Sequence, residues 1–169
     1  MDYYNDELKN LCEIIMGQSP ESSTYNSDGI GLPFFQGKTE FGEKYPTAVK
    51  WCTKPKKMAK AGDILISVRA PVGSTNIAST DCCIGRGLAA IRVNHEKLDR
   101  DFLLFQLKYL EGYLIKKGSG STFEAIGNDV LNNLEIIVPD LKEQKIISKK
   151  LERHFNEVEK TKKAIQCQT

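Results

Sequence analysis

Short hydrophobic runs alternate with clusters of turn-forming residues over the first 95 positions of the chain. Glycine, proline, serine and aspartate gather in segments such as QSPESS, SDGIG and APVGS, and the runs lie between them. This arrangement is typical of β-strands joined by tight turns. The pattern therefore predicts a compact, irregular β domain. Its expected strands cover residues 11–16, 32–35, 64–68, 75–78 and 88–93.

The hydrophobic period changes from strand to helix near Asp99. In DRDFLLFQLKYLEGYLIKK the hydrophobic residues recur mostly at helical spacing. Asp99 is a suitable N-cap, and Gly118 is a suitable end for the helix. The pattern predicts one helix over residues 99–118, then a flexible GSGST loop. A short helical turn near 128–133 and a strand at 134–138 are expected to complete the domain.

The longest uninterrupted helical pattern follows Pro139. Asp140 is a suitable N-cap, and Glu143 lies three residues on, as in a capping box. Nothing breaks the helix before about residue 166, so it would span roughly 40 Å. A narrow apolar stripe on such a charged helix predicts packing against another helix, either in the same domain or in a second subunit. The stripe consists of Ile147, Leu151, Phe155, Val158 and Ile165.

These patterns predict an α+β fold in two parts. Residues 1–139 would form an irregular, mostly-β domain with a few helices, and residues 140–169 one long coiled-coil-type helix. The chain has 169 residues, of which 40% are hydrophobic and 27% charged, enough for one domain with a core. No apolar run reaches the ~18 residues that a membrane span needs.

Cysteine usage and the first ten residues bear on the compartment. The five cysteines are odd in number and include no CxxC pair. They predict reduced thiols rather than a disulfide framework or a zinc site. The segment MDYYNDELKN is polar and acidic, unlike a signal peptide. We therefore expect a cytoplasmic protein.

The charge is balanced overall but not locally. A net charge of +2 excludes a generally basic protein that binds nucleic acid everywhere. The segment KWCTKPKKMAK (50–60) nevertheless carries lysines and no acidic residue. Two interpretations remain open for it, a solvated loop or a surface that contacts nucleic acid.

The sequence lacks the spacings that catalytic and cofactor sites require. It contains no GxGxxG, GxxxxGK[ST] or GxSxG motif, and no NPPY or DPPY. Neither His95 nor His154 has a cysteine or aspartate at the spacing of a metal site or a triad. We therefore predict no catalytic residue, no metal ligand and no cofactor bound by this chain.

Four blocks of the sequence resemble the specificity subunit of type I DNA restriction–modification enzymes. Three of them resemble its target-recognition domain, and the fourth resembles the junction into its spacer helix. The blocks are GQSPESSTYNSDGIGLPFFQG (17–37), GDILISVRAPVGSTNIA (62–78), CCIGRGLAAI (82–91) and LNNLEIIVPDLKEQKIISKKLE (131–152). The resemblance covers nearly the whole chain.

The resemblance implies a subunit without catalytic activity that reads double-stranded DNA. It would hold methyltransferase subunits, which methylate adenine, and a motor–nuclease subunit, which cleaves unmodified DNA. S-adenosylmethionine, ATP and Mg²⁺ would belong to these partner subunits. The usual member has two recognition domains joined by two long antiparallel helices. This sequence has one of each, so it corresponds either to a half-length subunit or to a fragment. Two copies that pack their helices together would rebuild the two-domain arrangement, and we expect a homodimer that reads a two-part site.

Polar residues in loops are the candidates for DNA contact, because the strands and helices are occupied with the core. Glutamine can pair with adenine in two hydrogen bonds, and lysine and arginine bind phosphates. The candidates are Gln36, Lys38, Lys54, Lys56, Lys57, Arg69, Arg86, Lys117, Ser119, Ser121 and Thr122. Arg86 lies between two glycines, where backbone can approach a ligand closely.

Other interpretations of these residues remain open. The two arginines are equally suited to hydrogen bonds with carbonyl groups of the protein itself. Gln36 and Lys38 also fit a plain surface turn, and the serines and threonine a linker. For the whole chain, the alternative is an interaction module that holds partners through its long helix and does not read DNA.

Overall fold

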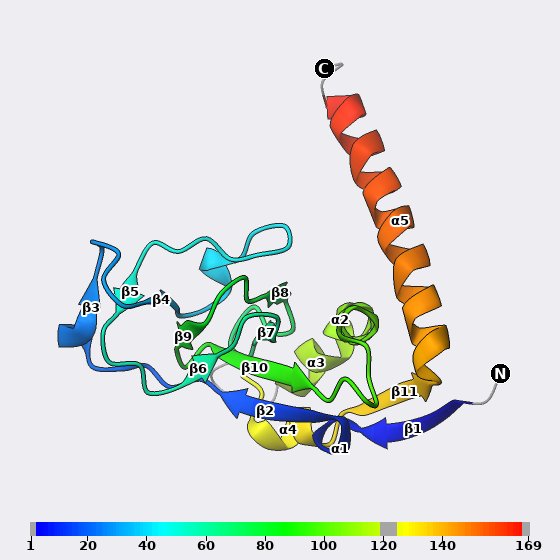
Figure 1. The fold of residues 1–169 in the computed structure, drawn as a ribbon, viewed down its shortest axis with the longest axis horizontal. Coiled ribbons are helices and arrows are strands. Elements are labelled where there is room, and N and C mark those ends of the chain that lie inside the picture. Colours follow the sequence, from blue (N-terminus) through cyan, green and yellow to red (C-terminus); the bar gives the residue numbers. More distant parts are fainter. Residues whose placement is uncertain (1–2, 119–124, 167–169) are drawn as a thin grey trace.

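A computed structural model of the chain describes residues 3–118 and 125–166 (Figure 1). The candidates Ser119, Ser121 and Thr122 and most of the GSGST loop lie outside these residues. The described residues form a body of three β-sheets and four short α-helices, from which one long helix projects. This arrangement confirms the predicted α+β fold class.

An antiparallel sheet of four strands lies at the centre of the body. Its order is β2 (Cys12–Met16), β10 (Leu88–Val93), β7 (Ile64–Ser67) and β8 (Thr75–Ile77). Both faces are covered, since Ile64 and Ile66 pack into one hydrophobic cluster while Leu65 between them packs into another. Burial on both faces explains the continuous hydrophobic runs at residues 64–66 of β7 and 88–91 of β10.

A second sheet of five short strands lies to one side of the central sheet (Figure 1). Its order is β3 (Tyr25–Asn26), β5 (Trp51–Cys52), β4 (Leu32–Phe35), β9 (Cys82–Ile84) and β6 (Met58–Ala59). Strands β4 and β9 are parallel, with Phe34 opposite Cys83. The adjacent thiols of Cys82 and Cys83 are both buried and belong to different clusters, as expected on a strand.

The helical segment after Asp99 differs from the prediction, since it forms two helices and not one. These are α2 (Arg100–Tyr109) and α3 (Glu111–Gly118), and Leu110 lies at the break between them. The change of direction has a tertiary cause. It allows the Ser74 hydroxyl to donate to Glu111 Oε1 at 3.0 Å, and it brings Gly118 against Val72. The Asp99 cap is confirmed, because its carboxylate accepts the Phe102 N–H at 2.9 Å.

A two-stranded sheet joins the two ends of the body. Strand β1 (Tyr3–Glu7) pairs antiparallel with β11 (Glu135–Pro139), with Tyr3 opposite Pro139. The short helix α1 (Leu8–Leu11) follows β1 directly, and α4 (Asn128–Asn132) lies against α1 and β2 (Figure 1). Strand β11 then leads directly into the long helix.

The long helix α5 (Leu141–Gln166) rises from the end of β11, away from the body (Figure 1). Its predicted cap is present, since Asp140 Oδ1 accepts the Glu143 N–H at 3.0 Å. Near its base α5 packs against β11 and α2. Among the described residues, no helix is both long enough and apolar enough to cross a membrane.

Candidate nucleic-acid interface

Four predicted DNA-contacting residues line one hollow of about 220 Å³ on the surface of the body. They are Gln36 and Lys38 after β4, Arg69 after β7, and Arg86 after β9. We call this feature the recognition hollow. Its described lining is Ser19, Gln36, Gly37, Lys38, Ser67, Arg69, Ala70, Arg86 and Gly87.

Sheet topology brings these three loops together. The parallel strands β4 and β9 end at the same edge, with Phe35 opposite Ile84, so Gln36 and Arg86 leave the sheet side by side. The Gly87 N–H donates to the Gln36 carbonyl at 3.1 Å. The Gly87 carbonyl in turn accepts the Val68 N–H at 2.9 Å, which ties in the loop that carries Arg69.

The glycines around Arg86 permit this close approach. A Cβ atom on Gly87 would lie 2.3 Å from the Gln36 carbonyl oxygen, and a Cβ on Gly85 would lie 3.1 Å from Gln36 Cγ. A Cβ on Gly17 would likewise meet the Gly85 carbonyl oxygen at 2.1 Å. The backbone that approaches these glycines therefore belongs to the chain itself, not to a ligand as the sequence suggested.

The recognition hollow is electropositive. Lys38, Arg69 and Arg86 contribute positive charge, and none of the described lining residues is acidic. Neither arginine side chain makes a hydrogen bond or ion pair within residues 3–118 and 125–166, and Arg86 bonds through its backbone N–H, which donates to Ser19 Oγ at 3.3 Å. Both guanidinium groups are thus available to an anion or a base edge.

The lysine-rich segment lies next to the strand that leads to Arg86. Lys54, Lys56 and Lys57 are exposed between β5 and β6. The Lys57 carbonyl accepts the Ile84 N–H at 3.0 Å, so this segment runs alongside β9. Its lysines form a second basic feature on the same sheet as Arg86.

Lys117 lies at the end of α3, where its Nζ is 5.4 Å from the centre of the Tyr113 ring. The two residues that flank 119–124 both lie near the Arg69 loop. Gly118 is close to Val72, and Ala125 forms a β-bridge with Arg69. The described residues on either side of 119–124 are therefore next to the loop that lines the hollow.

The apolar stripe of α5 divides into a packed base and an exposed far half. Ile147 packs on the core of the body, and Leu151 is half-buried. The Phe155 ring stacks on Phe105 of α2, with centroids 5.4 Å apart, although Phe155 remains 52% exposed. Val158 and Ile165 are exposed. The stripe therefore packs against the body of the same chain near the base of α5, and its far half is exposed.

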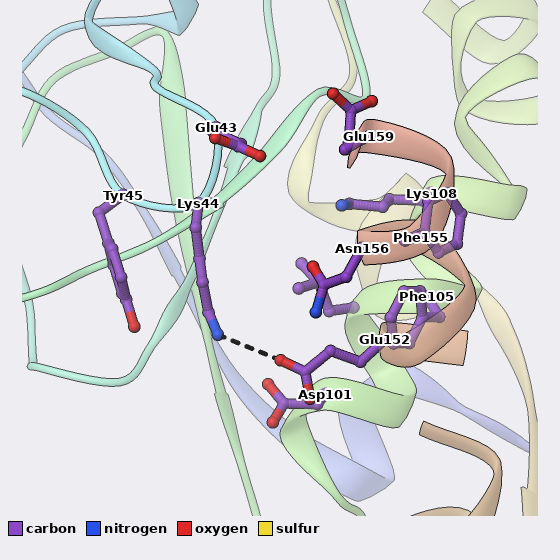
Figure 2. A pocket seen from close by; sticks show the side chains of 11 residues that line it. Glu43, Lys44, Tyr45, Asp101, Phe105, Lys108, Glu152, Phe155, Asn156 and Glu159 are labelled. Carbon is purple, nitrogen blue, oxygen red and sulfur yellow. Dashed lines mark ion pairs between the residues drawn. The ribbon is translucent and has the colours of Figure 1, made fainter. Parts of the chain in front are cut away.

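A larger hollow of about 750 Å³ separates this part of α5 from the loop at residues 43–45 (Figure 2). Lys44 reaches across it, with Nζ 3.6 Å from Glu152 Oε1. Lys108 lies over both stacked rings on the α2 side, 5.8 Å from the Phe155 centroid. The hollow contains acidic and basic side chains together, unlike the recognition hollow.

Ser19 and Ser67 line the recognition hollow but were not among the sequence candidates. Ser19 lies in the QSPESS turn cluster and Ser67 at the end of β7. Serine is common in both contexts, so the sequence carries no signal for them. Within the described residues, no group of three or more His, Cys, Asp and Glu side chains is placed to hold a metal ion.

Sequence comparisons with known proteins point to one family. The family described as "Type I restriction modification DNA specificity domain" matches residues 2–166. The putative type I restriction enzyme MjaX specificity subunit of Methanocaldococcus jannaschii is 47% identical over 163 residues, which cover 90% of this chain and 38% of the relative. The type I restriction enzyme MjaIX specificity subunit of the same organism is 27% identical, covering 96% of this chain and 40% of the relative.

Solved structures give the same answer. The HsdS subunit from Thermoanaerobacter tengcongensis matches with a TM-score of 0.87 and 50% identity, over 96% of this chain and 39% of that one. A chain from a type I restriction–modification system matches with a TM-score of 0.90 and 51% identity, over 96% and 40%. The S subunit from M. genitalium, at 19% identity and a TM-score of 0.71, shares the fold. The chain thus spans about 40% of the length of the proteins it matches.

Proposed function

The chain belongs to the family of type I restriction–modification DNA specificity domains, and from this premise we propose that it reads a specific sequence in double-stranded DNA. In this proposal the chain makes and breaks no bonds itself. It places methyltransferase subunits, which methylate adenine, and through them a motor–nuclease subunit, on a chosen stretch of duplex. S-adenosylmethionine, ATP and Mg²⁺ belong to those partner subunits.

One observation carries the proposal: Gln36 and two arginines, whose guanidinium groups have no hydrogen-bond or ion-pair partner among residues 3–118 and 125–166, line a single electropositive hollow. Arginine binds guanine O6 and N7 in a bidentate pair, and glutamine binds adenine N6 and N7. Each such pair discriminates against the wrong base by about 1–3 kcal/mol. Lys38 at the rim is suited to a phosphate rather than a base.

The lysine-rich segment fits a different role in the same proposal. Lys54, Lys56 and Lys57 are exposed, and a lysine ammonium binds phosphate as a point charge without reading the base sequence. Lysine on a phosphate releases condensed counterions, which adds affinity for every sequence and makes binding salt-dependent. We assign these lysines, and Lys117 at the end of α3, to the DNA backbone.

A second copy of the chain would supply the second reader of a two-part site. The exposed Val158 and Ile165 offer an apolar seam for a partner helix. The 26 residues of α5 span about 39 Å, which is close to the ~34–36 Å that separates half-sites one helical turn apart. The proposal is therefore a homodimer through α5 with two recognition domains.

The exposed seam of α5 also supports a second candidate, an interaction module that holds partners without reading DNA. The two candidates differ in how DNA binding depends on salt. A reader that neutralises several phosphates loses affinity steeply as salt rises, whereas a module that does not touch DNA shows no such slope.

The decisive experiment is methylation-site sequencing of random duplex DNA treated with the chain and its cognate methyltransferase subunit. We expect methylation at one sequence for the unaltered chain and relaxed base preference for Arg86→Ala. Arg153→Ala, an exposed arginine on α5 outside the hollow, is the matched control and should keep the preference. Methylation without sequence preference by the unaltered chain would overturn the proposal.

A further inference from the structure

Gln144, in the first turns of α5, is a fully buried polar side chain with 0% exposure. Its amide bonds to three backbone groups outside the helix. Oε1 accepts the Asp99 N–H at 2.7 Å, and Nε2 donates to the carbonyls of Lys97 at 3.1 Å and Pro139 at 2.8 Å. One side chain thus ties the base of α5 to the turn before α2 and to the end of β11.

A second glutamine fixes the strand that leads into α5. Gln106 on α2 donates from Nε2 to the Ile137 carbonyl at 2.9 Å, and its Oε1 accepts the Ile137 N–H at 3.0 Å. This amide takes the place of a neighbouring strand on the edge of β11 that β1 leaves unpaired. Strand β11 is therefore held on both edges before α5 begins.

The remaining contacts between α5 and the body are of other kinds. One is the ion pair between Lys44 and Glu152, whose side chains are both exposed, and an ion pair of this sort contributes little. The others are apolar. Ile147 packs on the core, and Phe155 stacks on Phe105 while half exposed. Apolar contacts are non-directional, so they tolerate small rotations and shifts of the helix. Hydrogen bonds to buried backbone groups have narrow distance and angle requirements, and leaving such groups unpaired is unfavourable. The glutamines are therefore the contacts that specify direction.

We propose that Gln144 is a positioning residue that fixes the direction in which α5 leaves the recognition domain and so sets the spacing between the two halves of the DNA site. The part about spacing rests on the proposed function. Because α5 spans about 39 Å, a tilt of about 10° at its base moves its far end by roughly 7 Å. That displacement is about two base-pair steps of ~3.4 Å, enough to change which spacer the dimer accepts.

The direct test measures the direction of α5 without DNA. Genetically encoded spin labels at Asp28 on the body and Lys163 on α5, in full chain diluted with unlabelled chain, report one distance distribution. We expect a narrow distribution for the unaltered chain. Gln144→Met, which keeps the volume and loses the hydrogen bonds, should widen it about twofold. Gln144→Ala is a second variant in case the first does not fold. Its smaller side chain leaves room for water to bond to the backbone groups of Asp99, Lys97 and Pro139 that Gln144 had paired.

Two controls separate direction from stability. Ser148 is also buried on α5, but among the described residues its hydroxyl bonds only to the Lys145 carbonyl of the same helix, so Ser148→Ala should leave the distribution narrow. Ile147→Ala should lower the melting temperature through a lost apolar contact without widening the distribution. An unchanged distribution in both Gln144 variants would overturn the inference.

The second measurement sequences methylated sites made by the Gln144 variants with the cognate methyltransferase subunit. We expect sites with spacers one or two base pairs longer or shorter than the single spacer of the unaltered chain. If the distribution widens and the spacer does not change, the link to spacing is wrong. If the unaltered chain directs no sequence-specific methylation, the proposed function is wrong, and the distance result still decides whether Gln144 fixes the helix.

Discussion

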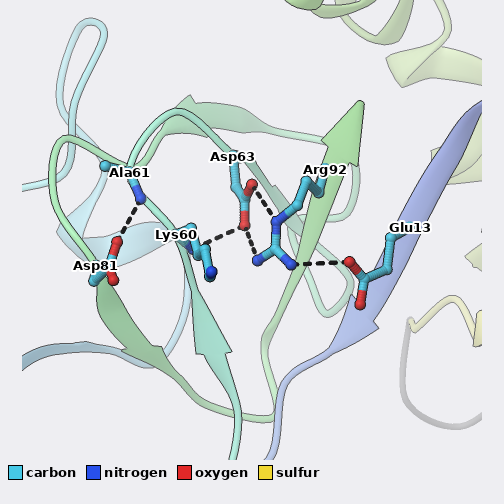
Figure 3. Close-up of polar contacts among 6 residues, drawn as sticks. All are labelled: Glu13, Lys60, Ala61, Asp63, Asp81 and Arg92. Carbon is cyan, nitrogen blue, oxygen red and sulfur yellow. Dashed lines mark hydrogen bonds and ion pairs between the residues drawn. The ribbon is translucent and has the colours of Figure 1, made fainter. Parts of the chain in front are cut away.

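The guanidinium of Arg92 donates two hydrogen bonds to the buried carboxylate of Asp63 (Figure 3). Nε donates to Oδ1 at 3.1 Å, and Nη2 donates to Oδ2 at 2.8 Å. Asp63 is 4% exposed and also accepts the Lys60 N–H at 2.8 Å. The hydrogen bonds between Arg92 and Asp63 raise the pKa of the Arg92 guanidinium above its ordinary value. The pair therefore ties the turn before β7 to β10 at the centre of the main sheet.

We expect Arg92→Ala to lower the free energy of unfolding by about 2–3 kcal/mol, because a buried carboxylate loses its charged partner. Urea denaturation measures the change. Glu13, the other partner of Arg92, has a side chain that is 63% exposed, so Glu13→Ala should change stability by less than about 1 kcal/mol. Equal losses in the two variants would contradict this account of Asp63.

Lys56→Ala and Lys57→Ala should weaken binding to all duplex sequences alike, because lysine on a phosphate carries no sequence information. Each lost contact should reduce the slope of log affinity against log salt by about one. A titration from low to high salt with the methyltransferase complex checks this. Lys142→Ala, an exposed lysine at the base of α5, serves as the control. A slope that the two variants leave unaltered would remove these lysines from the interface.

Gln36→Ala should change the preferred base, lowering affinity for the cognate site by about 1–3 kcal/mol and leaving non-specific affinity unchanged. The fold should persist, because the hydrogen bond from the Gly87 N–H uses the backbone carbonyl of Gln36. Competition between cognate and scrambled duplexes measures the difference. A lower melting temperature with unchanged preference would instead make Gln36 a plain turn residue.

Gly87→Ala should distort the recognition hollow, since its Cβ would lie 2.3 Å from the Gln36 carbonyl oxygen. We expect a loss of about 2 kcal/mol in stability and a loss of base preference together. Gly112 in α3 has open space around the same position, so Gly112→Ala should be neutral or stabilising by up to about 1 kcal/mol. Thermal melting and duplex competition on both variants test the pair.

Stability should fall as the pH rises from about 9 to 12. Burial raises the pKa of Cys82 to about 12, and that of Cys83 to about 12, from an ordinary value of 9.0. In this window the unfolded chain loses thiol protons that the folded chain keeps, so the unfolded state binds fewer protons and stability decreases. We expect a loss of about 1 kcal/mol per thiol by pH 10.

Urea denaturation at pH 8, 9 and 10 measures this decline. The double variant Cys82→Ala and Cys83→Ala should show a shallower decline over the same range than the unaltered chain. A decline of equal steepness would mean that other groups carry the pH dependence.

Features that depend on nearby residues were predictable from the sequence. Strands β4 and β10 have the predicted bounds, and the Asp99 and Asp140 caps both form. Each of these follows from a local pattern of hydrophobic residues or from a capping side chain. The long helix belongs to the same class, since nothing between Leu141 and Gln166 breaks it.

Features that depend on distant partners were not predictable in the same way. Strand β1 looks polar, and it forms because β11 lies beside it. The break at Leu110 has no proline beside it, and Gly112 two residues later lies inside α3, so the sequence does not place the break, at which Glu111 and Gly118 contact the body. The sequence nominated Gln36, Arg69 and Arg86 one by one, but their meeting depends on the parallel pairing of β4 with β9, which a single sequence does not reveal.

The ladder between β1 and β11 has a consequence for synthesis on the ribosome. Tyr3 pairs with Pro139, so the first strand must wait for nearly the whole body to be translated before its partner exists. Pairing across such a sequence separation is slow, and until then the edge of β1 is open to aggregation. A translational pause after residue 139 would give β1 time to pair with β11 before the long helix α5 is translated.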